Sequence, residues 1–180
     1  MRTMNGKIQD RIKIFEDICP LEPGEKNVLV QWLTQHHFFT APASTKYHGA
    51  YDGGLFDHSM TVYENLKTIC NQMPVQMDEI SMFIMAVLHD VCKCDLYEHG
   101  PEGWRHRDNV LLTGHGEKSV MMLATLDIPL TDEEVACIRY HMGAFCDSKE
   151  WSAYTNAIHV FPSVLWLHTA DMMAAHIDMI

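Results

Sequence analysis

The sequence lacks a hydrophobic run long enough to cross a bilayer. Its longest apolar run, residues 80–88, covers nine residues and ends in His89-Asp90, whereas a membrane-spanning helix needs roughly 20. The first twenty residues alternate charged residues with isoleucines and hold neither an apolar signal-peptide core nor a small-residue cleavage site. We therefore expect no membrane partner and a cytoplasmic location.

Paired cysteine motifs and basic charge are also scarce. None of the six cysteines forms a CxxC pair, and several sit at apolar helical positions, so we expect reduced thiols. Thirteen Lys and Arg face 24 Asp and Glu, for a net charge of −11. This balance argues against an extended nucleic-acid surface, because binding by counterion release needs many basic side chains.

Strand-type alternation and internal repeats are absent as well, while apolar residues recur at helical spacing. A chain of 180 residues with 47% hydrophobic composition can bury roughly 70% of its unfolded surface around one core. The predicted fold class is therefore all-α, a single-domain helical bundle. Within it, N-terminal helices in residues 1–44 pack on a core formed by residues 45–180.

The apolar spacing and the capping signals place most of the helices. Asp78 is a plausible N-cap for a buried helix, and Thr131 with Glu134 forms a capping-box pattern. Residues 92–114 and 143–157 are polar and are predicted to be loops. The predicted helices span residues 8–18, 25–36, 56–70, 79–88, 115 onward, 131–142 and 163 to near the C-terminus.

Twelve histidines stand out, because histidine is the commonest metal ligand. Several fall near predicted helix ends, where side chains can converge while apolar faces pack. The pair His89-Asp90 directly follows an apolar helix, and Lys93 comes three residues later. Burying these groups without partners would cost several kcal/mol, so the pattern favours a metal site between helices.

These stretches resemble the HD-domain superfamily of metal-dependent phosphohydrolases, in its form H…HD…H…H…D. The resemblance covers about residues 45–175 and includes the HD domain of 3′-to-5′ exoribonucleases, although their oligonucleotide-binding barrel has no counterpart here. The matching segments are KYHGAYDGGLFDHS, AVLHDVCK, TGHGEKSV, IRYHMG and LHTADMMAAH.

The resemblance implies two divalent transition-metal ions. Fe or Mn is favoured, whereas Co, Ni and Zn also suit such ligands. One ion would be held by His58, His89, Asp90 and Asp171, and the second by His115 and His141, with Asp90 bridging the two. Asp178 is a rival to Asp171, and Cys92 and Cys94 are further, weaker candidates near the metals.

The expected chemistry is cleavage of a P–O bond by attack of a metal-bound hydroxide. Four imidazoles and two carboxylates around two divalent ions leave a local charge of about +2, which attracts phosphate to an acidic chain. Asp90 and Lys93 are the predicted catalytic residues, and Lys93 would supply a proton or positive charge to the leaving group.

Other polar residues are candidates for substrate contact. Lys118 and Arg139 lie near His115 and His141, and Arg105 and Arg107 follow Trp104 in the long loop. His168 lies one helical turn before Asp171 and suits either a phosphate contact or packing. His48 and His159 also flank the expected pocket and are candidates for substrate contact, although a turn-stabilising role suits their positions slightly better.

The predicted partner is a small phosphorylated substrate: a nucleotide, a cyclic dinucleotide or a short oligonucleotide. A homo-oligomer is compatible with the sequence. Two alternatives remain open at this point. A minority of the superfamily uses two irons as an oxygenase, and a non-catalytic regulator would bind a nucleotide without turnover. Substrate-dependent oxygen uptake distinguishes the first, and binding without turnover distinguishes the second.

Overall fold

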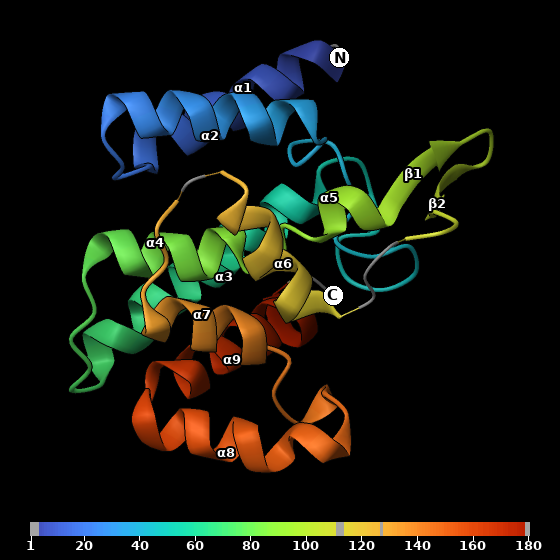
Figure 1. The fold of residues 1–180 in the computed structure, drawn as a ribbon. Coiled ribbons are helices and arrows are strands. Elements are labelled where there is room, and N and C mark those ends of the chain that lie inside the picture. Colours follow the sequence, from blue (N-terminus) through green and yellow to red (C-terminus); the bar gives the residue numbers. More distant parts are fainter. Residues whose placement is uncertain (1–3, 111–113, 127, 179–180) are drawn as a thin grey trace.

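The computed structural model describes residues 4–110, 114–126 and 128–178. Helices dominate it, and the only sheet among the described residues is a two-stranded hairpin, so the all-α prediction is confirmed (Figure 1). None of the described helices is long and apolar enough to cross a membrane. The helices are α1 (Met4–Ile18), α2 (Pro23–Gln35), α3 (Gly54–Gln72), α4 (Glu79–Leu88), α5 (Lys93–Leu96), α6 (His115–Ala124), α7 (Asp132–Tyr140), α8 (Trp151–Val160) and α9 (Ser163–Met173).

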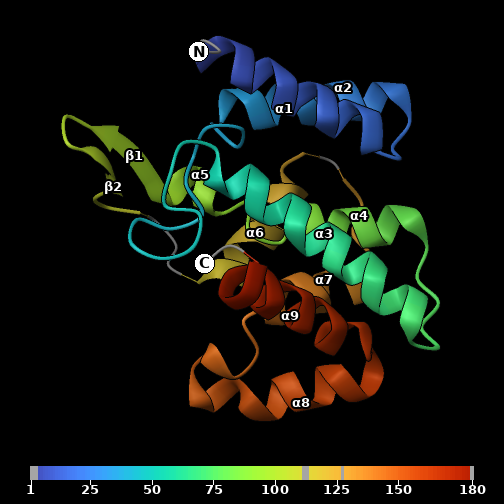
Figure 2. The ribbon, with the colours of Figure 1, turned by 180° about the vertical axis from the view of Figure 1, so that it is seen from behind.

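Helices α3, α4, α7 and α9 form the centre of the molecule. Helix α3 packs on α4 and α9, and α7 packs on α6 and α9, so all of these elements share one core (Figures 1 and 2). From Phe83 to Leu88, every residue of α4 is buried, which explains its unbroken apolar run. A helix buried on all sides can end in polar groups only where those groups find partners.

Two predicted N-caps fix the starts of α4 and α7. Asp78 accepts a hydrogen bond from the backbone N–H of Ser81, and Thr131 forms a reciprocal capping box with Glu134. The hydroxyl of Ser81 also donates to Glu134, at 2.8 Å. The two capping motifs are thereby joined, which aligns the starts of two helices that both end at the site.

Helices α1 and α2 lie side by side across one end of the bundle (Figures 1 and 2). Phe15, Leu29 and Leu33 are buried in the same hydrophobic cluster as the central helices. Arg11 of α1 donates to both carboxylate oxygens of Asp57 in α3, at 3.3 and 3.2 Å. The N-terminal helices are therefore anchored beside the first turn of α3.

The prediction of an irregular loop over residues 92–114 was wrong for most of that stretch. Helix α5 occupies its start, and strands β1 (Tyr97–Gly100) and β2 (Gly103–His106) form an antiparallel hairpin that projects from the bundle (Figure 1). The indole N–H of Trp104 donates to Asp52 at 2.6 Å and ties the hairpin to a distant loop. This tertiary contact stabilises strands that are too short to show an alternating pattern. Residues 111–113 lie outside the described residues.

The predicted loop over residues 143–157 was also partly wrong. It contains two short 3₁₀ turns, η1 (Gly143–Phe145) and η2 (Ser148–Glu150), and then helix α8. Only Ala157 of α8 is fully buried, so this helix has too narrow an apolar face to be recognised from its spacing. The last predicted helix is confirmed as α9, which is followed by a π-helical turn, η3 (Ala174–Asp178).

Candidate metal centre

His89 and His141 occupy equivalent positions at the C-terminal ends of two helices. The Nδ1–H of His89 donates to the carbonyl of Ala86 at 2.8 Å, and that of His141 donates to Ile138 at 2.7 Å. Since a carbonyl only accepts, these bonds place the proton on Nδ1 in the neutral ring. In each ring, Nε2 is left free to act as a ligand, held in place by the helix that carries it.

His58 and Asp171 come from the two helices packed beside α4. Nε2 of His58 lies 3.1 Å from Oδ1 of Asp171, which in turn lies 3.8 Å from Nε2 of His89. Burial lowers the pKa of His58, although Asp171 partly opposes this effect. Burial also disfavours the charged form of Asp171, but His58 and His89 outweigh it and lower the pKa of this carboxyl.

Asp90 lies at the centre of the group. Its oxygens lie 3.5 Å from Nε2 of His89, 3.6 Å from Nε2 of His141 and 3.8 Å from Nε2 of His58. The ammonium of Lys93 is 2.5 Å from Oδ2 of Asp90. Burial alone would raise the pKa of Asp90, but Lys93 and His89 hold it well below its usual range. Asp90 is therefore an ionised carboxylate at neutral pH.

Several of these converging atoms lack a hydrogen-bond partner. Nε2 of His89, Nε2 of His141 and Oδ1 of Asp90 are buried and unpaired within the part of the chain that the structure describes. A buried polar group without a partner costs about 1–3 kcal/mol, so a cluster of three is costly unless something binds between them. Imidazole nitrogens and carboxylate oxygens suit divalent transition metals, and this donor set fits such ions.

The described residues form three overlapping groups of potential metal ligands. Within each group, the ligand atoms lie within 4.8 Å of one another. The groups are His58, His89 and Asp171; His89, Asp90 and His141; and Asp90, Cys92 and His115.

His115 approaches this centre from the start of α6. The next residue, Gly116, lies so close to α7 that a Cβ atom there would overlap the carbonyl oxygen of Arg139. This close approach brings His115 toward the end of α7, where His141 lies. Nδ1 of His115 is 3.5 Å from the sulfur of Cys92, and burial raises the pKa of that thiol to about 12. All six cysteines are free thiols, as predicted.

The centre opens into a cavity of about 850 Å³. Of the residues predicted for the site, Asp90, Lys93, His115 and Asp171 line this cavity, whereas His58, His89 and His141 lie behind them and are fully buried. His48 also lines it and packs against His58 in a tilted arrangement, with ring centroids 4.8 Å apart. Burial, together with the neighbouring His58 and Lys93, lowers the pKa of His48 to about 4.

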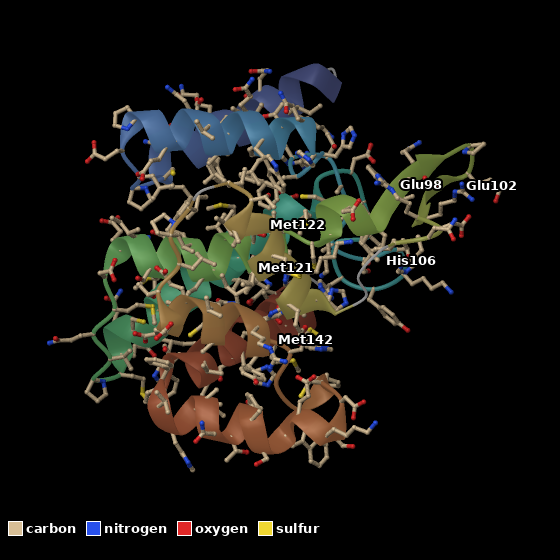
Figure 3. The ribbon with its side chains drawn as sticks, in the orientation of Figure 1. Glu98, Glu102, His106, Met121, Met122 and Met142 are labelled. Carbon is tan, nitrogen blue, oxygen red and sulfur yellow. The ribbon has the colours of Figure 1, made fainter. Side chains whose placement is uncertain are left out.

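The four basic side chains expected to contact substrate are paired with acids and do not line the cavity. Lys118 and Arg107 share Asp95, at 2.5 and 2.8 Å. Arg139 forms ion pairs with Glu117 and Glu150, at 3.0 and 3.2 Å. Arg105 pairs with Glu98 on the hairpin, and Glu98 is labelled in Figure 3. A substrate contact by any of them would require its ion pair to open.

His168 contacts the centre indirectly. Its Nδ1–H donates to the backbone carbonyl of His141 at 2.7 Å, so it holds the end of α7 that carries the ligand-type imidazole. His159 is exposed on α8 and does not line the cavity. Asp178 accepts a hydrogen bond from Asn65 at 2.8 Å, and the structure brings Asp171, rather than Asp178, to the histidines.

The sequence patterns missed several side chains that line the cavity, among them Tyr47, Phe145, Met142 and His176. Tyr47 lies in an irregular segment and Phe145 in a 3₁₀ turn, where no periodicity signals which way a side chain points. Met142 directly follows His141 at the end of α7 (Figure 3). Its position beside a ligand-type histidine is the one signal that could have identified it.

An all-α bundle with buried histidines and aspartates gathered at the ends of its helices defines the class of helical proteins with a metal centre between helices. The HD domain family matches residues 55–157, more than half of the chain, and the chain belongs to this family. The match covers every predicted ligand except Asp171. Family membership indicates a metal-dependent phosphohydrolase in general terms. No curated protein and no solved structure matches the chain significantly.

Proposed function

We propose that this protein hydrolyses a P–O bond of a small nucleotide, cyclic dinucleotide or short oligonucleotide, with two divalent metal ions bound by His58, His89, Asp90, His115, His141 and Asp171. The observation that supports this proposal is the set of buried, unpaired ligand-type atoms on His89, Asp90 and His141 at the wall of a cavity. Bound metals lower the pKa of a coordinated water and neutralise charge on phosphoryl oxygens.

The residues of the chain have distinct tasks in this proposal. Asp90 stays ionised, and its unpaired Oδ1 would be free to bind a metal, because Lys93 holds its other oxygen. Lys93 is buried, lines the cavity and keeps its charge, since Asp90 outweighs the effect of burial and raises the pKa of the ammonium. In this proposal, Lys93 would hold a proton and positive charge near the leaving group.

The test is to load the purified protein with Mn²⁺ or Fe²⁺ and to measure phosphate or nucleoside release from nucleotides, cyclic dinucleotides and oligonucleotides. We expect turnover by the wild type and a loss of at least about 10³-fold in His89→Ala and in Asp90→Asn. His159→Ala is the matched control, because this exposed histidine lies outside the cavity, and it should keep full activity.

Two outcomes would overturn the proposal. Equal phosphate release by wild type and His89→Ala would show that the activity comes from a contaminant. Substrate-dependent oxygen uptake with the iron-loaded protein, and no hydrolysis with a redox-inert metal, would assign an oxygenase instead.

A further inference from the structure

The cavity beside the metal centre offers very little positive charge of its own. Among its described lining residues, Lys93 is the sole lysine or arginine, and its ammonium is already held by Asp90 at 2.5 Å. Four other basic side chains, Lys118, Arg105, Arg107 and Arg139, are paired with Asp95, Glu98, Glu117 and Glu150. A second phosphate group beyond reach of the metals would therefore find no free lysine or arginine among the described residues that line the cavity.

The outer part of the cavity is instead apolar and aromatic. Tyr47 is 82% exposed and Phe145 is 69% exposed, and both line the cavity together with Met142 and Met172. A ligand that covers large, exposed apolar side chains removes their surface from water, which favours binding. Aromatic rings at such a position suit a flat ligand, which they contact by stacking.

The size of the cavity suits a small molecule. Sites for small molecules enclose about 300–1,000 Å³, and the 850 Å³ of this cavity falls in that range. A substrate of mononucleotide size fits such a space.

We infer that the substrate carries a single phosphate group attached to an aromatic or apolar group, and that Tyr47 and Phe145 bind this aromatic or apolar group. This inference rests on the proposed function, since the phosphate is placed at the metals. It narrows the substrates to phosphomonoesters of mononucleotide size and excludes nucleoside polyphosphates, cyclic dinucleotides and oligonucleotides.

Matched substrates test the inference on the metal-loaded enzyme. Adenosine 5′-monophosphate and ribose 5-phosphate share the scissile bond and differ in the aromatic base, whereas adenosine 5′-triphosphate adds two phosphates. We expect kcat/KM for the monophosphate to exceed that for each of the other two by about tenfold or more. Tyr47→Ala and Phe145→Ala should raise the KM for adenosine 5′-monophosphate, so that its kcat/KM no longer exceeds that for ribose 5-phosphate. Tyr47→Phe should retain the preference for adenosine 5′-monophosphate.

A binding measurement separates this inference from the proposed function. Benzylphosphonate and methylphosphonate resist hydrolysis, so their binding to the metal-loaded protein can be measured by calorimetry even if no substrate turns over. Benzylphosphonate should bind about tenfold more tightly, and Tyr47→Ala and Phe145→Ala should remove the difference. Trp151→Ala is the control, because this exposed aromatic lies outside the cavity lining.

Each failure has its own meaning. An absence of turnover with every substrate, but tighter binding of benzylphosphonate, would overturn the proposed function and leave the aromatic subsite standing. Preferred hydrolysis of the triphosphate, or equal binding of both phosphonates, would overturn the inference of a singly phosphorylated aromatic substrate.

Discussion

At the scale of single residues, the centre depends on histidines held by the backbone of the helix that precedes them. The last four carbonyls of an α-helix have no partner within the helix, so a histidine just past the end can donate Nδ1–H to one of them. His89 and His141 both do so, to the carbonyl three residues earlier. The hydrogen bond that caps the helix also points Nε2 into the site. One hydrogen bond therefore both ends the helix and orients the potential ligand.

His168 gives a test of this arrangement, because it binds the backbone carbonyl of His141. His168→Ala removes that donor and loosens the end of α7, and we expect metal affinity to fall by about 10–100-fold, as for other residues that orient metal ligands. Calorimetric titration with Mn²⁺ measures the change. His168→Gln keeps an N–H donor and should recover part of the affinity. Equal losses in both variants would contradict the positioning role.

The imidazole of His48 should remain neutral at unusually low pH. Its pKa is about 4 in the folded protein because of burial and the neighbouring His58 and Lys93, against about 6.5 when unfolded. A lowered pKa stabilises the folded state fully above pH ~6.5, and this contribution disappears as the pH falls toward 4. We expect the metal-free protein to lose stability over this range, as measured by urea unfolding at several pH values.

His48→Gln is the matched variant for this pH dependence. It removes the titrating group while keeping a polar side chain of similar length, so its stability should fall less steeply between pH 6.5 and 4 than that of the wild type. An NMR titration that placed the midpoint of His48 near 6.5 would refute the prediction.

Some residues of the site could be predicted from the sequence, and others could not. The pair His89-Asp90 after an apolar run indicated a buried polar site, because packing alone would not select those groups there. The basic residues were harder to interpret. Whether Lys118 or Arg139 faces a substrate or an acid depends on partners such as Asp95 and Glu150, which tertiary packing alone brings close.

At the scale of elements, the contact between α6 and α7 decides how closely His115 approaches the other proposed ligands. Gly116→Ala would drive a methyl group against the carbonyl of Arg139, forcing the helices apart. We expect a loss of about 1–3 kcal/mol in the free energy of unfolding and weaker binding of the second metal ion. Chemical denaturation and metal titration measure the two effects.

Gly24→Ala provides the control for that substitution. Gly24 lies in α2, and a Cβ atom added there would meet no other group within 4 Å, so alanine should stabilise the protein by about 0.4–1 kcal/mol. If both alanine variants had the same stability, close packing at Gly116 would not be the reason for its glycine.

Elements with strong local signals were predictable, and elements held by distant contacts were not. The starts of α4 and α7 follow from side chains that cap their own helix, namely Asp78 and Thr131. The β1–β2 hairpin depends on the bond from Trp104 to Asp52 across 52 positions of sequence. Such a contact carries no periodicity, because the residues between its partners belong to other elements.

At the scale of the whole molecule, an acidic chain must attract an anionic substrate. The net charge is −11, and Lys93 and the four basic side chains expected to contact substrate are paired with acids. Bound cations would therefore supply most of the positive potential. With the six ligands proposed above, two divalent ions leave a local charge of about +2, which makes substrate binding depend on metal occupancy.

The stability of the folded chain should depend on metal for the same reason. Bound ions give partners to the buried atoms of His89, Asp90 and His141, and a ligand present at 100 times its Kd stabilises the folded state by about 2.7 kcal/mol. We therefore expect a chelator to lower the thermal unfolding midpoint of the wild type. The same treatment should change the midpoint of His89→Ala far less, whereas His159→Ala should respond like the wild type. An equal response in all three proteins would place the stabilising metal elsewhere in the molecule.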